Sequence, residues 1–119
     1  ITVVFAEFLN YTKGHLMSRD GERAISQLLY KLKNDQHINI TMQAYDDARE
    51  DFRLTKDGIL AIAIKELEDG IKIKKVDQET GSTGWVIMPE IYDTKAYFKF
   101  CIEGSQELLT IVSAHKSRH

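Results

Sequence analysis

The side chains best suited to chemistry in this 119-residue sequence are basic residues, gathered in three parts of the chain. Such cations bind acidic surfaces or phosphates, although lysines also decorate the exposed faces of most soluble domains. Three basic clusters in a chain whose net charge is −2 suggest a basic surface on one side of the molecule. The candidate binding residues are Lys13, His15 and Arg19 in the first cluster, Lys72, Lys74 and Lys75 in the second, and Lys116 and Arg118 in the third.

No recognisable catalytic motif accompanies these cations. Residues 81–84 read Gly-Ser-Thr-Gly, which is not the Gly-x-Ser-x-Gly turn of hydrolases, and the sequence has no glycine-rich phosphate-binding loop. Cys101 falls within an apolar stripe of helical spacing, where we expect a buried and inert thiol. The sequence therefore predicts neither an enzymatic activity nor a cofactor.

Two groups of residues could be read as metal ligands. His115 and His119 are four residues apart, but zinc takes four ligands and neither a cysteine pair nor a third histidine accompanies them. The acidic run over residues 46–51 lacks the alternating ligands and the internal glycine of a calcium loop, so we interpret it as a solvated helix face. We predict no metal site.

The composition is that of a folded domain: 43% of the residues are hydrophobic and 29% are charged. The 16 basic and 18 acidic residues argue against a domain that grips any nucleic acid non-specifically. One cysteine allows no internal disulfide and suits a reducing compartment, and no apolar run is long enough to cross a membrane. Because the chain begins at Ile1 without a leader pattern, we expect the C-terminal fragment of a longer protein.

Charge is distributed unevenly along the sequence. Residues 43–69 hold four basic and eight acidic groups, a balance of −4, whereas residues 1–42 and 70–119 each have a balance of +1. We therefore expect an anionic partner to contact the outer parts of the chain.

The apolar spacing predicts helices in the first part of the chain. Residues 2–10 are the first, and a second runs from a Ser18 cap to about Asn34. Thr41 and Thr55 are predicted to cap two more, the last of which stops at residues 69–70. A buried strand over residues 59–64 is an alternative to this last helix.

The rest of the chain predicts a hairpin and a closing helix. Residues 71–74 alternate apolar and basic side chains, residues 81–84 suggest a turn, and residues 85–88 form the partner strand. From residue 93 or 94 to residue 112 the apolar spacing looks helical again. The prediction is one α+β domain over residues 1–119, a winged-helix-like helical bundle with a small antiparallel β-hairpin or sheet and a closing C-terminal helix.

Three segments resemble the C-terminal microtubule-binding domain of the first subunit of the spindle and kinetochore-associated complex. Residues 11–16, Tyr-Thr-Lys-Gly-His-Leu, are similar to that family's Tyr-x-Lys-Gly-Arg-Leu motif. Residues 84–88, Gly-Trp-Val-Ile-Met, look like the strand that follows its lysine-rich turn, and residues 108–112 resemble its closing helix. Lys13 and Gly14 match the motif, whereas His15 stands in the place of its arginine, and residues 36–70 do not match.

The resemblance implies a winged-helix-derived domain that binds the acidic microtubule lattice through several exposed cations. It also implies a place at kinetochores and spindle microtubules during chromosome segregation, with other subunits of a parent complex as further partners and no membrane. Contacts of this kind are each worth about 0–1 kcal/mol, so affinity must come from their number.

Two other functions fit a winged helix. A DNA-binding domain would use the hairpin lysines on phosphate, but the preceding helix would expose Asp57, Glu66 and Glu68, which repel phosphate and make nucleic acid an unlikely partner. A protein–protein interaction module of a larger assembly is the other alternative, because fold alone does not fix function.

Overall fold

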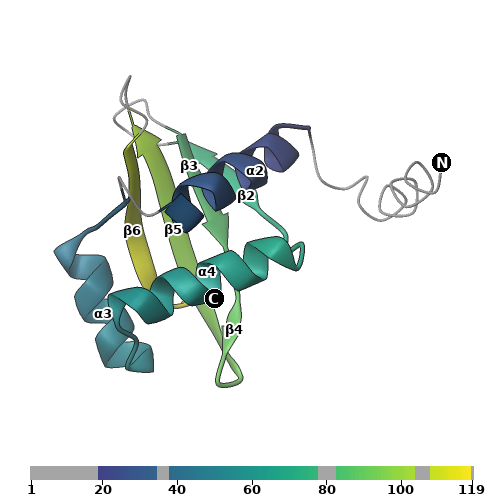
Figure 1. Ribbon diagram of the computed structural model, residues 1–119. Coiled ribbons are helices and arrows are strands. Elements are labelled where there is room, and N and C mark those ends of the chain that lie inside the picture. The colour runs from purple at the N-terminus through teal and green to yellow at the C-terminus, as the bar shows by residue number, and fades with distance from the viewer. Residues whose placement is uncertain (1–18, 35–37, 78–82, 104–107, 119) are drawn as a thin grey trace.

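Helices lie against one face of a mixed β-sheet in the computed structural model, which describes residues 19–34, 38–77, 83–103 and 108–118 (Figure 1). The predicted helix over residues 2–10 and the Ser18 cap fall outside the described residues. In chain order the elements are α2 (Arg19–Asn34), β1 (Ile38–Ile40), α3 (Met42–Phe52), α4 (Lys56–Glu68), β2 (Lys74–Asp77), β3 (Thr83–Ile87), β4 (Glu90–Ile91), β5 (Thr94–Glu103) and β6 (Leu108–Lys116).

The two predicted threonine caps are confirmed. The Thr41 hydroxyl oxygen accepts a hydrogen bond from the Ala44 N–H at 3.1 Å, and the Thr55 hydroxyl accepts one from the Gly58 N–H at 3.1 Å. Each bond satisfies a donor that the first turn of a helix leaves without a backbone partner. Helix α4 ends at Glu68, directly before the predicted stop at residues 69–70, where the φ of 83° at Gly70 favours a residue without a side chain.

The apolar stripes of the helices face the sheet. Leu28 and Leu32 of α2 are buried, as the spacing predicts. The alternative strand over residues 59–64 is wrong, because Ile59 and Ala63 are buried on one side of a helix. The helical layer therefore follows from the sequence nearly element by element.

The sheet has the strand order β1-β6-β5-β3-β2, and β4 pairs with β5. Strand β1 runs parallel to β6, whereas the other pairs are antiparallel. The predicted pairing of two strands after α4 is confirmed, but β2 begins only at Lys74 instead of spanning residues 71–74. Its partner β3 overlaps the predicted strand over residues 85–88 but begins two residues earlier, inside the predicted turn, and residues 81–82 of that turn are outside the described part of the chain.

The predicted closing helix is wrong: this part of the chain forms the long strands β5 and β6. Ala96, Phe98 and Phe100 are fully buried, and the residues between them point to the other face of the sheet. Burial of every second residue is typical of a strand. The predicted helix would instead have placed the neighbours Tyr97 and Phe98 together on its buried stripe.

The winged-helix-like bundle is consequently wrong as a fold class. The described residues form three helices and a six-stranded sheet, and β2 and β3 are its last two strands instead of a separate small hairpin. The core lies between the helical layer and the sheet, where Leu28, Ile59, Phe98, Phe100 and Ile111 have no exposed surface. The protein is an α+β fold in which the sheet is the larger element.

Helix α3 covers an edge of β6 that no strand covers within the described residues. Strand β1 pairs only with residues 109–111 of β6. At the end of this pairing, the Thr41 N–H donates to the Ile111 carbonyl at 3.1 Å. Further along β6, the Lys116 N–H donates to the Asp51 carboxylate at 2.9 Å. These two bonds fix the two ends of α3 along the edge and satisfy backbone groups that would otherwise face solvent.

The turn between β4 and β5 uses residues poorly suited to it. Tyr92 and Asp93 both have positive φ, 53° and 63°, which is the conformation of a type I′ hairpin turn. Tyr92 is 80% exposed and therefore contributes little to the core. Replacing the pair with Asn-Gly (Tyr92→Asn, Asp93→Gly) is expected to raise the free energy of unfolding by about 0.5–1 kcal/mol, because these residues adopt positive φ with less strain.

Thermal unfolding measures this effect. The control is Tyr92→Ala, which removes the ring but keeps a side chain in the left-handed conformation and should not stabilise the domain. An equal gain in both variants would assign the effect to the exposed ring instead of the turn.

Candidate functional site

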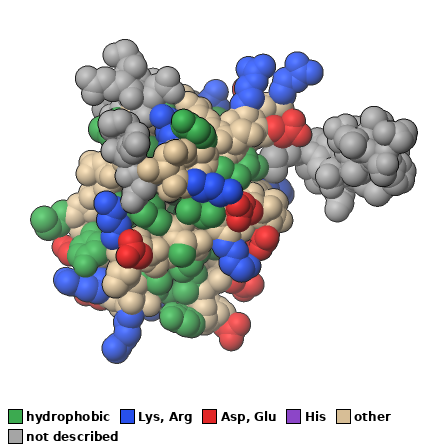
Figure 2. All heavy atoms as spheres, viewed as in Figure 1, with side chains coloured by type: hydrophobic (Ala, Val, Ile, Leu, Met, Phe, Trp, Pro, Cys, Tyr) green, Lys and Arg blue, Asp and Glu red, His purple; other side chains and the backbone are tan. Residues whose placement is uncertain are grey.

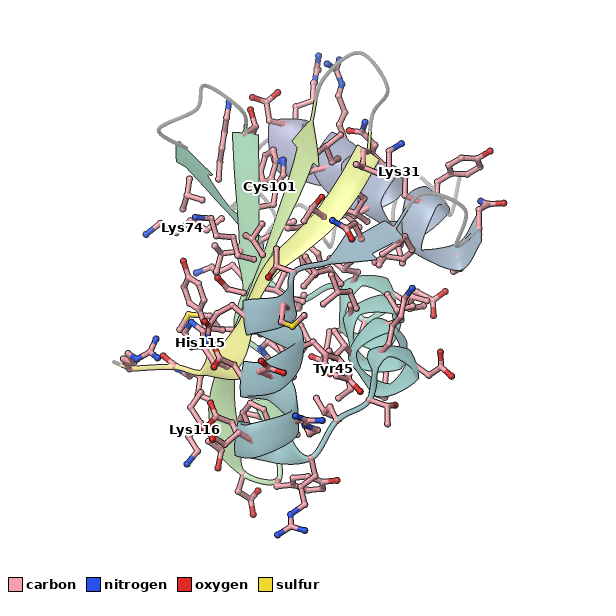
Figure 3. The ribbon with its side chains drawn as sticks, turned by 90° about the vertical axis from the view of Figure 1, so that its left-hand side faces the viewer. Lys31, Tyr45, Lys74, Cys101, His115 and Lys116 are labelled. Carbon is pink, nitrogen blue, oxygen red and sulfur yellow. The ribbon has the colours of Figure 1, made fainter. Side chains whose placement is uncertain are left out.

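The side of the sheet opposite the helices is the candidate functional surface. Within β5, Phe98 and Phe100 face the helices, so Tyr97 and Lys99 point to the opposite side. No helix of the described residues covers that side, and we call it the open face (Figure 3). By strand register, the open face includes Asn39, Lys74, Val76, Gly84, Val86, Glu90, Lys95, Tyr97, Lys99, Cys101, Leu108, Thr110, Ser113 and His115.

Two lysines lie in one row across the open face. Lys74 of β2 is opposite Val86 of β3, which is opposite Lys99 of β5. Ser113 of β6 ends the row. Figure 3 shows Lys74 projecting from the sheet away from the helices. With neighbouring strands about 4.8 Å apart, the two lysine backbones are separated by about 10 Å.

The middle of the open face is made of short side chains. Val86 is 5% exposed, Cys101 4% and Thr110 5%, although none of them belongs to the core between the sheet and the helices. Lys74 is exposed and Lys99 is half-buried. Cys101 is buried as predicted, but it lies on a strand instead of a helical stripe.

An aromatic and cationic cluster lies at one end of the open face. The rings of Tyr97 and His115 stack with their centroids 5.2 Å apart and 11° between their planes. The His115 Nδ1 lies 2.7 Å from the Lys116 carbonyl oxygen, which can only accept, so we assign the proton to Nδ1. The Nε2 atom of the neutral ring can then accept from the Arg118 guanidinium at 3.3 Å. These contacts hold a cation beside the two rings.

The balance of charge differs between the two sides of the molecule. Lys74, Lys99 and Arg118 make no ion pair with a described residue, and the described acidic side chain that belongs to the open face by register is Glu90, which lies opposite Lys95. The helical side carries both signs interspersed (Figure 2). By register the open face therefore holds more described cations than described acids, namely Lys74, Lys95 and Lys99 against Glu90.

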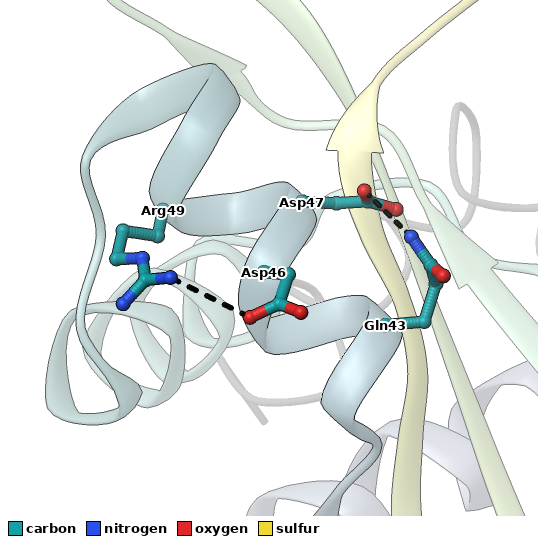
Figure 4. A network of polar contacts seen from close by, with 4 residues as sticks. All are labelled: Gln43, Asp46, Asp47 and Arg49. Atoms are coloured by element: carbon teal, nitrogen blue, oxygen red, sulfur yellow. Dashed lines mark hydrogen bonds and ion pairs between the residues drawn. The ribbon is translucent and has the colours of Figure 1, made fainter.

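On the helical side three cations are paired with acids. Arg49 lies 3.7 Å from the Asp46 carboxylate on α3, where Gln43 also donates to Asp47 at 2.9 Å (Figure 4). Further ion pairs join Lys33 to Glu68 and Lys65 to Asp69. Asp69 raises the pKa of Lys65, first through their hydrogen bond and then through its charge. These cations are already partly neutralised by their neighbours.

The structure does not bring the eight predicted binding residues together. Lys74 belongs to the open face, and Arg118 reaches it through His115. Lys75 lies opposite Trp85, and Lys116 opposite Ala96, so both belong to the side that the helices cover. The three remaining groups are Arg19, exposed at the start of α2; Lys72, exposed between α4 and β2; and Lys13 with His15, outside the described residues.

Sequence reasoning missed Tyr97 and Lys99, and it considered His115 only as a metal ligand. The missing signal was the alternation of Ala96, Phe98 and Phe100 with these residues, which places them on the opposite side of a strand. Once β5 is a strand, its register with β3 and β6 joins Lys99 to Lys74 and Tyr97 to His115.

Within the part of the chain that the structure describes, no three or more His, Cys, Asp or Glu side chains are arranged to hold a metal ion, and none of its helices is long and apolar enough to span a membrane. No protein-family model matches the sequence, and no curated protein matches it.

Proposed function

We propose that this chain is a non-catalytic module that binds an acidic protein surface, and that the microtubule lattice is its partner. The observation that carries the proposal is a group of available cations: Lys74, Lys99 and Arg118 make no ion pair with a described residue, whereas Lys33, Arg49 and Lys65 on the helices are paired with carboxylates. Cations without a carboxylate partner attract an acidic surface more strongly than cations that are already paired.

The microtubule partner is taken from the sequence resemblance. The three segments that carry this resemblance differ in how they compare with the structure. Residues 11–16 lie outside the described part of the chain, and residues 84–88 belong to strands or their ends as in the family. Residues 108–112, expected in a closing helix, are in β6 instead. The charge pattern therefore supports an acidic partner independently, and only the resemblance points to microtubules, to kinetochores and to other subunits of a parent complex.

The binding expected of such a surface is weak for one copy and sensitive to salt. Exposed lysine–carboxylate contacts are worth about 0–1 kcal/mol each and are screened over about 8 Å at physiological ionic strength. Several linked copies would convert these weak contacts into strong attachment, because the second contact becomes intramolecular.

Cosedimentation with stabilised microtubules tests the proposal. We expect the domain to pellet at low salt and to be released at physiological salt, and a version dimerised by a coiled coil to stay bound at both. A duplex-DNA gel shift on the same preparation is the control, and we expect no shift. Absence of pelleting by the dimerised version at low salt would contradict the proposal, as would a DNA shift without pelleting.

A further inference from the structure

We infer that the open face binds an extended, glutamate-rich peptide segment that crosses the strands. The inference rests on the proposed function, because the tails of tubulin are acidic segments of this kind, and it specifies which part of such a partner is recognised. Its evidence is the row formed by Lys74, Val86 and Lys99, together with the Tyr97–His115 stack beside it.

The spacing of the two lysines matches an extended peptide. Their backbones are two strands apart, about 10 Å, as strand spacing requires. A peptide in the extended polyproline II conformation has three residues a turn and advances about 3.1 Å a residue, so carboxylates three residues apart lie on one side of it, about 9 Å apart. Glutamates at positions i and i+3 could therefore meet Lys74 and Lys99 together.

The side chains between the two lysines are short and buried. Val86 lies between them and is 5% exposed, and its neighbours Gly84 and Cys101 are also buried. These short side chains leave the longer lysines and the Tyr97 ring as the parts that reach a ligand. A bound chain would therefore contact the lysines and the Tyr97 ring, because Val86, Gly84 and Cys101 are too buried to be reached.

The ring stack adds an apolar contact of defined geometry. Tyr97 is half-buried and its ring is held against His115, so it loses less conformational freedom on binding than an unrestrained side chain. Arg118, in contact with the His115 ring, supplies a third cation beyond the lysine row. On the helical side Arg49 also lies over a ring, that of Tyr45 at 5.5 Å, but this guanidinium is already paired with the Asp46 carboxylate.

A fluorescently labelled 12-residue glutamate-rich peptide is the probe, and fluorescence anisotropy at low salt is the measurement. We expect the Lys74→Glu/Lys99→Glu variant to lose about tenfold or more of its affinity for the peptide, since two attractions become repulsions. The milder Lys74→Gln/Lys99→Gln variant should lose about threefold. Circular dichroism and thermal unfolding establish that each variant is folded.

A matched control changes the same charge elsewhere. Arg23→Glu/Lys56→Glu alters the net charge equally but lies on α2 and α4, where both side chains are exposed. We expect less than about a twofold change in peptide affinity, because these charges are remote from the open face. Equal losses in the control and in the open-face variants would overturn the inference.

The peptide and microtubule assays separate this inference from the proposed function. Pelleting with microtubules without peptide binding would overturn the inference and leave the proposed function in place. Peptide binding without pelleting would support the inference and contradict the microtubule proposal. If a single-stranded oligothymidine of equal charge bound more tightly than the peptide, the inference would be overturned in favour of a nucleic acid that stacks on Tyr97.

Discussion

Replacing Phe98 with alanine is expected to lower the free energy of unfolding by about 3–5 kcal/mol. Phe98 is in the central strand β5 and has no exposed surface; its cross-strand neighbours are Ile87 and Ala114. Removing the ring leaves a cavity that the surrounding sheet and helices cannot fill. Urea denaturation followed by the fluorescence of Trp85, the single tryptophan, measures the loss.

The neighbouring Tyr97 is the matched control for this substitution. It is also aromatic and also in β5, but it belongs to the open face and is half-buried. We expect Tyr97→Ala to cost clearly less than Phe98→Ala. Similar losses at both positions would contradict the alternation of β5 and would favour the helical stripe that the sequence suggested. Because domains of this size are stabilised by about 5–15 kcal/mol, Phe98→Leu provides a milder variant if the alanine variant unfolds.

Replacing Asp51 with alanine is expected to cost about 1.5 kcal/mol of stability, the second large effect. Its carboxylate accepts the Lys116 N–H at 2.9 Å and so connects the end of α3 to the end of β6. Hydrogen bonds to charged groups contribute about 1.5–3 kcal/mol, and the lower value applies because Asp51 is half-buried. Urea denaturation of the variant gives the value directly.

Glu50 supplies the control for this bond. It precedes Asp51 in the same helix, is exposed, and has the same charge. Acidic groups near a helix C-terminus are unfavourable, so Glu50→Ala should leave stability unchanged or raise it slightly. Hydrogen exchange adds a local readout: the Lys116 amide should lose protection in Asp51→Ala but keep it in Glu50→Ala. Unchanged protection in Asp51→Ala would show that the bond does not hold the edge of β6.

The helical layer could be predicted because its signals are local. Thr41 and Thr55 cap helices by bonding backbone groups three residues away, and Gly70 ends one through its own φ. The stripe of Leu28 and Leu32 likewise depends on spacing within one helix. Such interactions need no knowledge of the rest of the chain.

The sheet could not be predicted in the same way. Tyr97, Phe98, Cys101 and Ile102 fit a helical spacing as well as a strand, and the choice depends on partners in β3 and β6 that the local sequence does not name. The parallel pairing of β1 with β6 is equally non-local. Tertiary pairing therefore overrode a local pattern that allowed both structures.

The candidate site could not be predicted because the strands were not. Lys74 and Lys75 were grouped because they are adjacent in sequence, yet adjacent residues of a strand point to opposite faces. Lys99 was not selected because a helical reading gave it no connection to Lys74. The charges were visible in the sequence, but the surface that they share was not.

The parallel pairing of β1 with β6 has a consequence for how the chain folds as it is synthesised. Ile38 is opposite Leu109, so most of the described chain must emerge from the ribosome before that pair can form. Until β6 arrives, β5 would present a long apolar edge, the kind of strand that associates with other chains. Nascent chains truncated before residue 108 are therefore the species most in need of a chaperone, and contacts so distant in sequence favour slow folding.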